Sequence, residues 1–166
     1  VPDRATLDML LTAAARTPDH GKLEPWRFVV LGKPALARLA AMIPERAAVL
    51  NIAPDTVEKA ISQYRDADLA IVVVDSPVAS EKVPQIEQAY SAGAVCLSLL
   101  NATLAAGWGA NWLSGWASHD RVFCEHGVGL APHERIAGLI HIGTETNAPP
   151  ERPRPDLAQK VTWLDA

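Results

Sequence analysis

The spacing of apolar residues along the chain predicts alternating helices and strands. Residues 69–74 form a continuous apolar run typical of a strand covered on both faces, and we expect it at the centre of a sheet. Shorter apolar runs predict strands at 28–31, 110–113 and 136–142. Helical spacing predicts a first helix that Asp3 caps and that ends before Pro18, then helices at 34–42, 57–64, 86–106 and 120–126. The segment 44–54 is weakly patterned.

The chain from Glu145 onward has no core pattern. Its prolines stand at positions 149, 150, 153 and 155, ahead of an apolar tip at Val161–Leu164. Repeated proline favours an extended backbone, so we expect residues 145–166 to form an extended arm. The apolar tip, which includes Trp163, predicts that this arm docks on another surface. Residues 1–144 then form one domain.

Composition narrows the classes of function. A chain of 166 residues with 49% hydrophobic residues can bury one sizeable core. Its net charge is −4 and no segment gathers Lys and Arg, which argues against a nucleic-acid surface. Ser91, Ser98 and Asn101, together with Glu87, interrupt the helix at 86–106, so we do not expect it to span a membrane.

Cysteine and serine positions argue against two further classes. Cys96 and Cys124 lie far apart, and Cys124-x-His126 matches no zinc-ligand spacing, so we expect no metal site and a reducing cytoplasm. Ser114 lacks the glycine two positions earlier that a hydrolase nucleophile elbow requires. The chain opens at Val1 without a targeting segment, and the missing initiator Met leaves room for residues upstream.

The segment 16–26 is the first candidate for ligand binding. Arg16, His20 and Lys22 place three cationic or titratable donors within seven residues at a helix exit, and Trp26 follows them. Such a loop suits a small, anionic, planar ligand. The alternative is a capped, solvated turn with Trp26 in the core.

The segment 112–116 is the second candidate. Trp112 and Trp116 flank the hydroxyl of Ser114 and a flexible Gly115. Two tryptophans near a strand end can line a ligand, but they more often belong to the core.

These segments, taken in order, resemble the nitroreductase family of flavoproteins. The motifs that carry the resemblance are Arg16-Thr-Pro-Asp-His20, Pro25-Trp26, Ile71–Val74, an Ala- and Gly-rich helix ending Ala105-Ala-Gly-Trp-Gly-Ala110, Trp112-Leu-Ser-Gly115 and Ile142-Gly-Thr144. No one of these motifs is specific, but their order along nearly the whole chain is.

The resemblance implies an α+β fold, an α/β/α sandwich with a mostly antiparallel central sheet, in an intertwined homodimer. It further implies one FMN in each of two clefts that both subunits build from their 1–144 domains. The long helix at 86–106 would pack against its mate, and the arm at 145–166 would embrace the partner subunit.

The resemblance also implies an activity. A hydride would pass from NADH or NADPH through flavin N5 to a nitroaromatic, quinone or similar acceptor, with no dedicated catalytic side chain. Arg16 and His20 would contact FMN, and Trp112, Leu113 and Ser114 would line it through backbone and hydroxyl groups. The implied nicotinamide contacts are Ala102, Thr103, Leu104, Ala105, Ala106 and Gly107. Alternatives on the same fold are reductive dehalogenation, flavin breakdown, or a non-catalytic dimer that binds FMN or another small ligand.

Two features depart from the family pattern. The family usually carries an Arg-Arg-Ser-type segment that binds the FMN phosphate, and this chain begins after that place. Glu24 stands where relatives commonly have Gln, and an ionised carboxylate beside a reduced flavin is unfavourable. We therefore expect that Glu24 points away, or pairs with Lys22 or Arg27, or that FMN binds differently here.

Overall fold

Strand β2, Leu69–Asp75, is the centre of the fold, and all seven of its residues are buried. Strands β1 (Trp26–Gly32) and β4 (Arg135–Gly143) pair with it on either side, and β3 (Gly109–Leu113) pairs with the far edge of β4. Every pairing is antiparallel, in the order β1-β2-β4-β3. The structure is a computed structural model that describes residues 1–164. It confirms the central strand predicted at 69–74.

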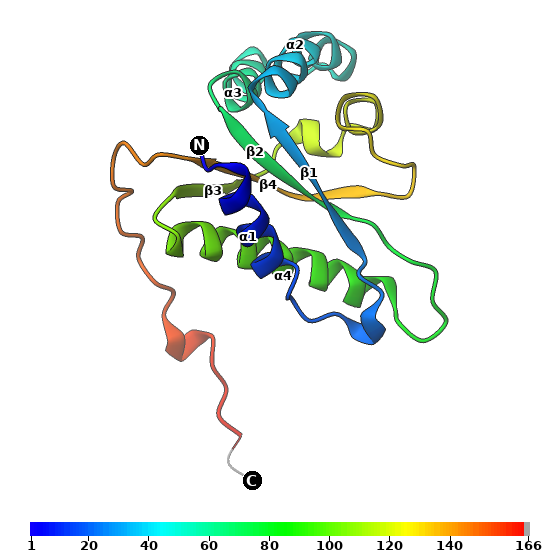
Figure 1. Ribbon diagram of the computed structural model, residues 1–166. Helices are drawn as coiled ribbons and strands as arrows, with labels where there is room; N and C mark the ends of the chain where they lie inside the picture. The colour runs from blue at the N-terminus through cyan, green and yellow to red at the C-terminus, as the bar shows by residue number, and fades with distance from the viewer. Residues whose placement is uncertain (165–166) are drawn as a thin grey trace.

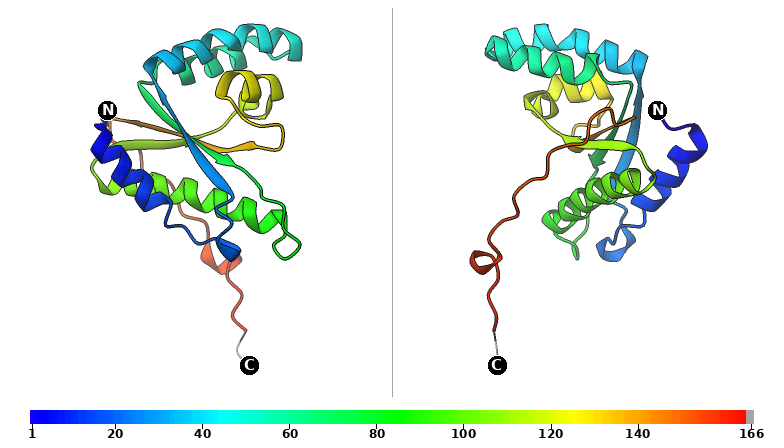
Figure 2. Two further views of the ribbon diagram at one scale, coloured as in Figure 1. Left: turned by 45° about the vertical axis from the view of Figure 1, so that its right-hand side comes forward. Right: turned by 90° about the vertical axis from the view of Figure 1, so that its left-hand side faces the viewer.

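Helices cover both faces of the sheet (Figures 1 and 2). One layer holds α1 (Arg4–Ala14) and α4 (Gln85–Ala105), and the other holds α2 (Lys33–Leu50) and α3 (Pro54–Arg65) with the short helical segments η2 (Trp116–His119) and η3 (Phe123–Val128). Alternate residues of β2 supply the two cores, which explains why its apolar run has no polar interruption. The predicted α+β fold with helices on both faces is confirmed.

Helix α2 is longer than the sequence pattern suggested. It continues through Pro44 to Leu50, into the weakly patterned segment 44–54 for which the sequence predicts no helix. Pro44 is exposed, while Ile43 and Ala47 continue the buried face of the helix. The guanidinium of Arg46 donates to both carboxylate oxygens of Asp120, at 2.6 and 3.0 Å, and so fastens the continuation to η3.

The helix predicted at 120–126 begins near the expected residue, at Arg121, but runs two residues further, to Val128. Its second part, η3, spans Phe123–Val128 and ends at Gly129, whose φ of 83° is in the left-handed region. Gly127 is buried, and a Cβ on it would lie 2.8 Å from Leu39 Cδ2. Close packing on α2 therefore explains why residue 127 is a glycine. The left-handed backbone that ends the helical segment explains the glycine at 129.

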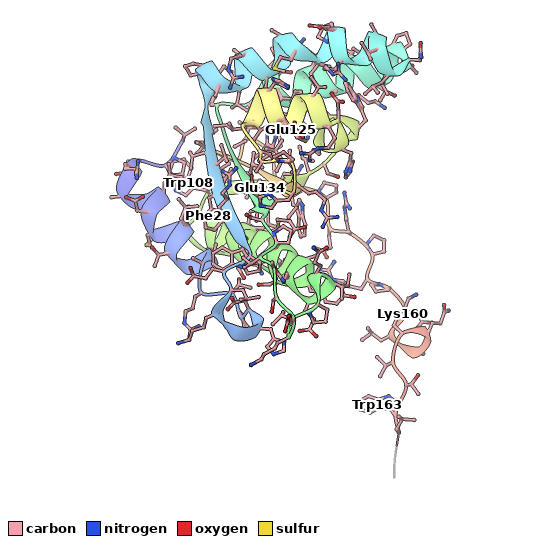
Figure 3. The ribbon with its side chains drawn as sticks, turned by 90° about the vertical axis from the view of Figure 1, so that its right-hand side faces the viewer. Phe28, Trp108, Glu125, Glu134, Lys160 and Trp163 are labelled. Carbon is pink, nitrogen blue, oxygen red and sulfur yellow. The ribbon has the colours of Figure 1, made fainter. Side chains whose placement is uncertain are left out.

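The tail leads away from the three-layer body (Figures 1 and 3). Residues 144–164 are exposed throughout, and their one regular element is the short turn η4 (Leu157–Gln159). The side chains at the tip are 83% exposed for Trp163 and 90% for Leu164. The predicted arm at 145–166 ends in two residues that lie outside the described part of the chain. No helix within residues 1–164 has the length and apolar character needed to cross a membrane.

An ion pair joins β1 to Glu134, the residue before β4. Arg27 donates from Nε and Nη2 to the two carboxylate oxygens of Glu134, each at 2.6 Å. Glu134 also accepts from the backbone N–H of Ala131 at 2.8 Å and is buried. These hydrogen bonds, chiefly those from Arg27, lower the pKa of Glu134 to about 2.

This pKa predicts a specific acid dependence of stability. The unfolded Glu134 titrates near 4.5, so its stabilising effect is complete above that pH and is lost as the pH falls towards about 2. Glu134→Gln should lower the free energy of unfolding at pH 7 by about 2 kcal/mol and should flatten this acid limb. Urea unfolding from pH 2.5 to 7 measures both effects. Glu58→Gln, at an exposed pair with Arg65, is the control, and an acid limb as steep in Glu134→Gln as in the parent would contradict the assignment.

Candidate active site

The loop at residues 16–25, between α1 and β1, is fixed on one side of α4. Ser91 on α4 accepts from Trp26 Nε1–H at 3.1 Å and donates to the carbonyl of Pro18 at 2.9 Å, so it holds both ends of the loop. The hydroxyls of Thr17 and Ser98 lie 3.0 Å apart. The loop tip is exposed, while Trp26 is half-buried, hydrogen-bonded and packed against the core.

The backbone of the loop is strained. Lys22 and Glu24 have φ values of 55° and 47°, which side-chain-bearing residues rarely adopt, and Gly21 has a φ of 76°. The carboxylate of Asp19 accepts from the backbone N–H of Glu24 at 2.6 Å and closes the turn. This conformation persists because the loop is fastened from within by Asp19 and from α4 by Ser91.

The two predicted FMN contacts on this loop are accessible. Arg16 is exposed, and its guanidinium makes no ion pair with residues 1–164. His20 Nδ1 lies 2.6 Å from Glu87 Oε2 on α4. An open cleft of about 370 Å³ adjoins the contact between His20 and Glu87. It is lined by Pro18, Asp19, His20, Glu87, Tyr90, Ser91 and Ala94.

Glu24 does not pair with Arg27, because Glu134 occupies that guanidinium. Glu24 is exposed, and no ion pair links it to Lys22 or to any other residue from 1 to 164. Of the three alternatives for Glu24, pairing with Lys22 or Arg27 is therefore wrong, and the other two stay open.

The second predicted group lies on β3. The indole of Trp112 reaches across Gly138 of β4 towards α4: a Cβ on Gly138 would lie 2.3 Å from Trp112 Nε1 and 2.9 Å from Cys96 Sγ. Glycine at 138 therefore provides the space for this ring, which stays partly exposed. Leu113 is half-buried. Ser114 is exposed and forms no hydrogen bond through its hydroxyl with the described residues. Because β3 is an edge strand, its outer backbone groups are free for a ligand.

The two groups lie on opposite edges of the molecule. Strand order places β1 and β3 three strand spacings apart, about 14 Å. On α4, Glu87, Ser91 and Ser98 share the side that holds the loop, whereas Cys96 follows Glu87 by about two and a half turns and faces the other way. One copy of the chain therefore carries Arg16 and His20 on one loop, and Trp112, Leu113 and Ser114 at the end of β3, but keeps the two groups apart.

The predicted nicotinamide contacts, 102–107, occupy the last turn of α4 and the residues after it. Thr103 is buried and donates its hydroxyl to the carbonyl of Leu99 at 2.8 Å. Leu104, Ala105 and Ala106 are exposed, Ala102 is half-buried, and Gly107 has a φ of 82°. The helical rise places Ala102 about 22 Å along the axis from Glu87, so this set is distant from the His20 end of α4.

An exposed apolar stripe on α4 separates the two groups. Its side chains recur at helical spacing and are each 48% exposed or more: Ile86, Tyr90, Leu97 and Leu104. Exposed apolar side chains gathered on one face mark an interaction surface.

Sequence reasoning missed two residues that shape this region, Glu87 and Ser91. Their signal is polar spacing by one helical turn within an otherwise apolar helix, and it was interpreted only as evidence against a membrane span. Within residues 1–164, no three His, Cys, Asp or Glu side chains are placed to hold a metal ion.

Comparison with known proteins identifies the family. The model of the Nitroreductase family matches residues 1–144. The chain belongs to the nitroreductase family. An Escherichia coli K12 relative, YdjA, which carries the provisional name NAD(P)H nitroreductase, is 31% identical over 143 residues, covering 86% of this chain and 78% of YdjA.

Solved structures of family members share the fold. A nitroreductase-like family protein from Bacillus cereus superimposes with a TM-score of 0.82 at 22% identity, covering 100% of this chain and 87% of that one. A nitroreductase from Desulfovibrio desulfuricans in complex with FMN gives a TM-score of 0.74 at 20% identity, covering 99% and 87%. These likenesses confirm the nitroreductase-like fold that the order of motifs implied.

Loss of the Ser91 hydroxyl should loosen the loop at 16–25. Ser91→Ala leaves the Trp26 indole N–H and the Pro18 carbonyl without a partner at a buried position, so we expect the free energy of unfolding to fall by about 1–2 kcal/mol. Urea unfolding measures it. Ser62→Ala is the control, since that hydroxyl bonds only within α3. Equal stability of the two variants would show that Ser91 does not hold the loop.

Proposed function

We propose that this protein is an FMN-dependent oxidoreductase, active as a homodimer, that transfers a hydride from NADH or NADPH to a small acceptor such as a nitroaromatic or a quinone. One observation carries the proposal: a member of the nitroreductase family presents two incomplete binding groups on either side of an exposed apolar stripe. Two copies that meet through this stripe would complete a site that one copy leaves divided.

The accessible groups fit FMN. The unpaired guanidinium of Arg16 suits the anionic phosphate or the pyrimidine end of a reduced flavin. The free edge of β3 at Leu113 offers backbone donors and acceptors for the polar edge of the ring, and Ser114 adds a hydroxyl. Trp112, already seated against Gly138, adds a rigid apolar wall. The family relative from D. desulfuricans binds FMN, which supports the same cofactor here.

Bound FMN would supply the hydride chemistry at its N5 atom. The side chains of this protein then have the tasks of binding, orienting and stabilising charge. Arg16 and His20 would favour the negative charge that reduction adds, and Trp112 would exclude water from one side of the ring. No side chain is assigned as a catalytic acid.

The end of α4 remains our proposed nicotinamide contact. Ala105 and Ala106 offer an exposed apolar surface beside the stripe, while Thr103 can contribute only backbone, because its side chain is buried. The name of YdjA, an NAD(P)H nitroreductase, supports a nicotinamide donor of either kind.

The dimer rests on two exposed apolar features. The α4 stripe would pack against the same stripe of a second copy, as two-fold symmetry allows, and the arm from residue 145 would reach across to the partner. Val161, Trp163 and Leu164 are apolar and exposed, which is unfavourable unless they dock on another surface.

Removal of the Arg16 charge should weaken cofactor binding. We expect Arg16→Ala to raise the Kd for FMN about tenfold, since a charge-assisted hydrogen bond is lost, and to slow NADH and NADPH oxidation with a nitroaromatic or quinone acceptor. Flavin fluorescence titration and absorbance at 340 nm measure the two effects. Arg4→Ala, at an exposed α1 position, is the control. A parent protein that does not bind FMN would overturn the proposed function.

Charge on the α4 stripe should break the dimer. Leu97→Lys places an ammonium in the middle of the proposed interface, and we expect mostly monomer in sedimentation velocity and loss of bound FMN. Trp163→Ala should weaken the dimer to a smaller extent. Val49→Lys, at an exposed apolar position on α2, is the matched control. Unchanged sedimentation of Leu97→Lys would contradict an interface on α4.

A further inference from the structure

The contact between His20 and Glu87 is a specific link between the loop and α4. His20 Nδ1 and Glu87 Oε2 are 2.6 Å apart although 67 residues separate them in the sequence. Both side chains are accessible, at 60% and 45% exposure, and both line the open cleft beside α4. Arg16 and Lys22, the other two donors of the loop, have no such partner among residues 1–164.

The chemistry of this contact fixes the hydrogen positions on the imidazole. An ionised carboxylate can only accept hydrogen bonds, so the hydrogen between the two residues belongs to Nδ1. Nε2 is then the ring nitrogen that remains for a ligand. The contact also holds the ring plane, because the Glu87 carboxylate is carried by the first turn of a long, well-packed helix.

Folding alone does not account for a carboxylate at position 87. An ion pair between two exposed side chains adds little to stability, since water solvates both groups and the pairing restricts two side chains. Hydrogen-bonding a histidine through one nitrogen so that the other has a defined role is, by contrast, a common arrangement at binding sites. Asp19 lines the same cleft, but its carboxylate is already committed to the Glu24 N–H.

We propose that Glu87 is a positioning residue for His20, which sets the tautomer and orientation of the imidazole so that Nε2 meets the cofactor. This proposal rests on the proposed FMN function. Glu87 does not contact the reacting atoms: it acts through His20.

The tautomer can be tested without cofactor. Long-range ¹H–¹⁵N NMR of the full chain reports which ring nitrogen of His20 carries hydrogen. We expect the Nδ1–H form in the parent and in Glu87→Gln, whose amide oxygen still accepts, and a mixture of tautomers in Glu87→Ala. A parent protein with His20 mainly in the Nε2–H form would overturn the proposal whether or not the protein binds FMN.

A double-mutant cycle tests the effect on the cofactor. FMN titration of His20→Ala, Glu87→Ala, Glu87→Gln and the His20→Ala/Glu87→Ala double variant gives four dissociation constants. We expect each alanine variant to raise the Kd about fivefold to tenfold, the double variant to match His20→Ala alone, and Glu87→Gln to stay within about twofold of the parent. Glu58→Ala, which removes an exposed carboxylate on α3, is the matched control.

The other outcomes distinguish failure of the proposed role of Glu87 from failure of the proposed FMN function. If Glu87→Ala weakens binding as much in the His20→Ala background as in the parent, Glu87 does not act through His20 and the proposal is overturned. An unchanged Kd in Glu87→Ala beside a raised Kd in His20→Ala overturns it as well. If His20→Ala itself binds FMN like the parent, the role of His20 fails and takes the proposal with it, while FMN binding by the parent still supports the oxidoreductase.

Discussion

The packing of α4 against the sheet is the constraint on which the rest of this structure depends. Leu99 and Val95 are fully buried beneath β2 and β4, so one side of the helix cannot take part in anything else. The other three sides of α4 are available for contacts with the rest of the chain or with another molecule. One side holds the loop through Glu87 and Ser91, the opposite side receives the indole of Trp112, and the face away from the sheet carries the apolar stripe.

The use of different sides of α4 by the loop and by β3 explains why the candidate site is split. A helix about 10 Å across stands between the loop and β3, and the strand order places their anchors on opposite edges of the sheet. The two groups therefore flank the stripe instead of facing each other within one copy. A second copy on the stripe is the simplest way to bring complementary groups together, and an arm that extends from the body suits the same assembly.

The strained loop and the ion pair below it lie at one end of the sheet. Trp26, Asp75 and Arg135 are register partners across β1, β2 and β4, so the loop enters the sheet where these strands begin or end. Burial raises the pKa of Asp75, whereas hydrogen bonds from Arg27 lower that of Glu134. The buried Glu134, hydrogen-bonded by Arg27 and by the backbone N–H of Ala131, ties β1 to the start of β4 at this end and supports a loop backbone that includes three left-handed residues.

The sequence by itself determined the elements whose pattern is local. The uninterrupted apolar run at 69–74 required cover on both faces, the cap at Asp3 began α1, and the order of weak motifs identified the family. It underestimated α2, because the continuation past Pro44 depends on Arg46 reaching Asp120, a partner 74 residues away.

Only the tertiary structure decided how the candidate residues are grouped. Arg16 and Trp112 look equivalent as positions in a chain, yet strand order puts them on opposite edges. Glu87 carried no motif, and its contact with His20 exists because packing brings the start of α4 beside the loop. Periodicity records what each segment buries, and it holds no information on which distant segment lies across from it. Hydrogen bonds between segments that are distant in the sequence are therefore seen only in the folded structure.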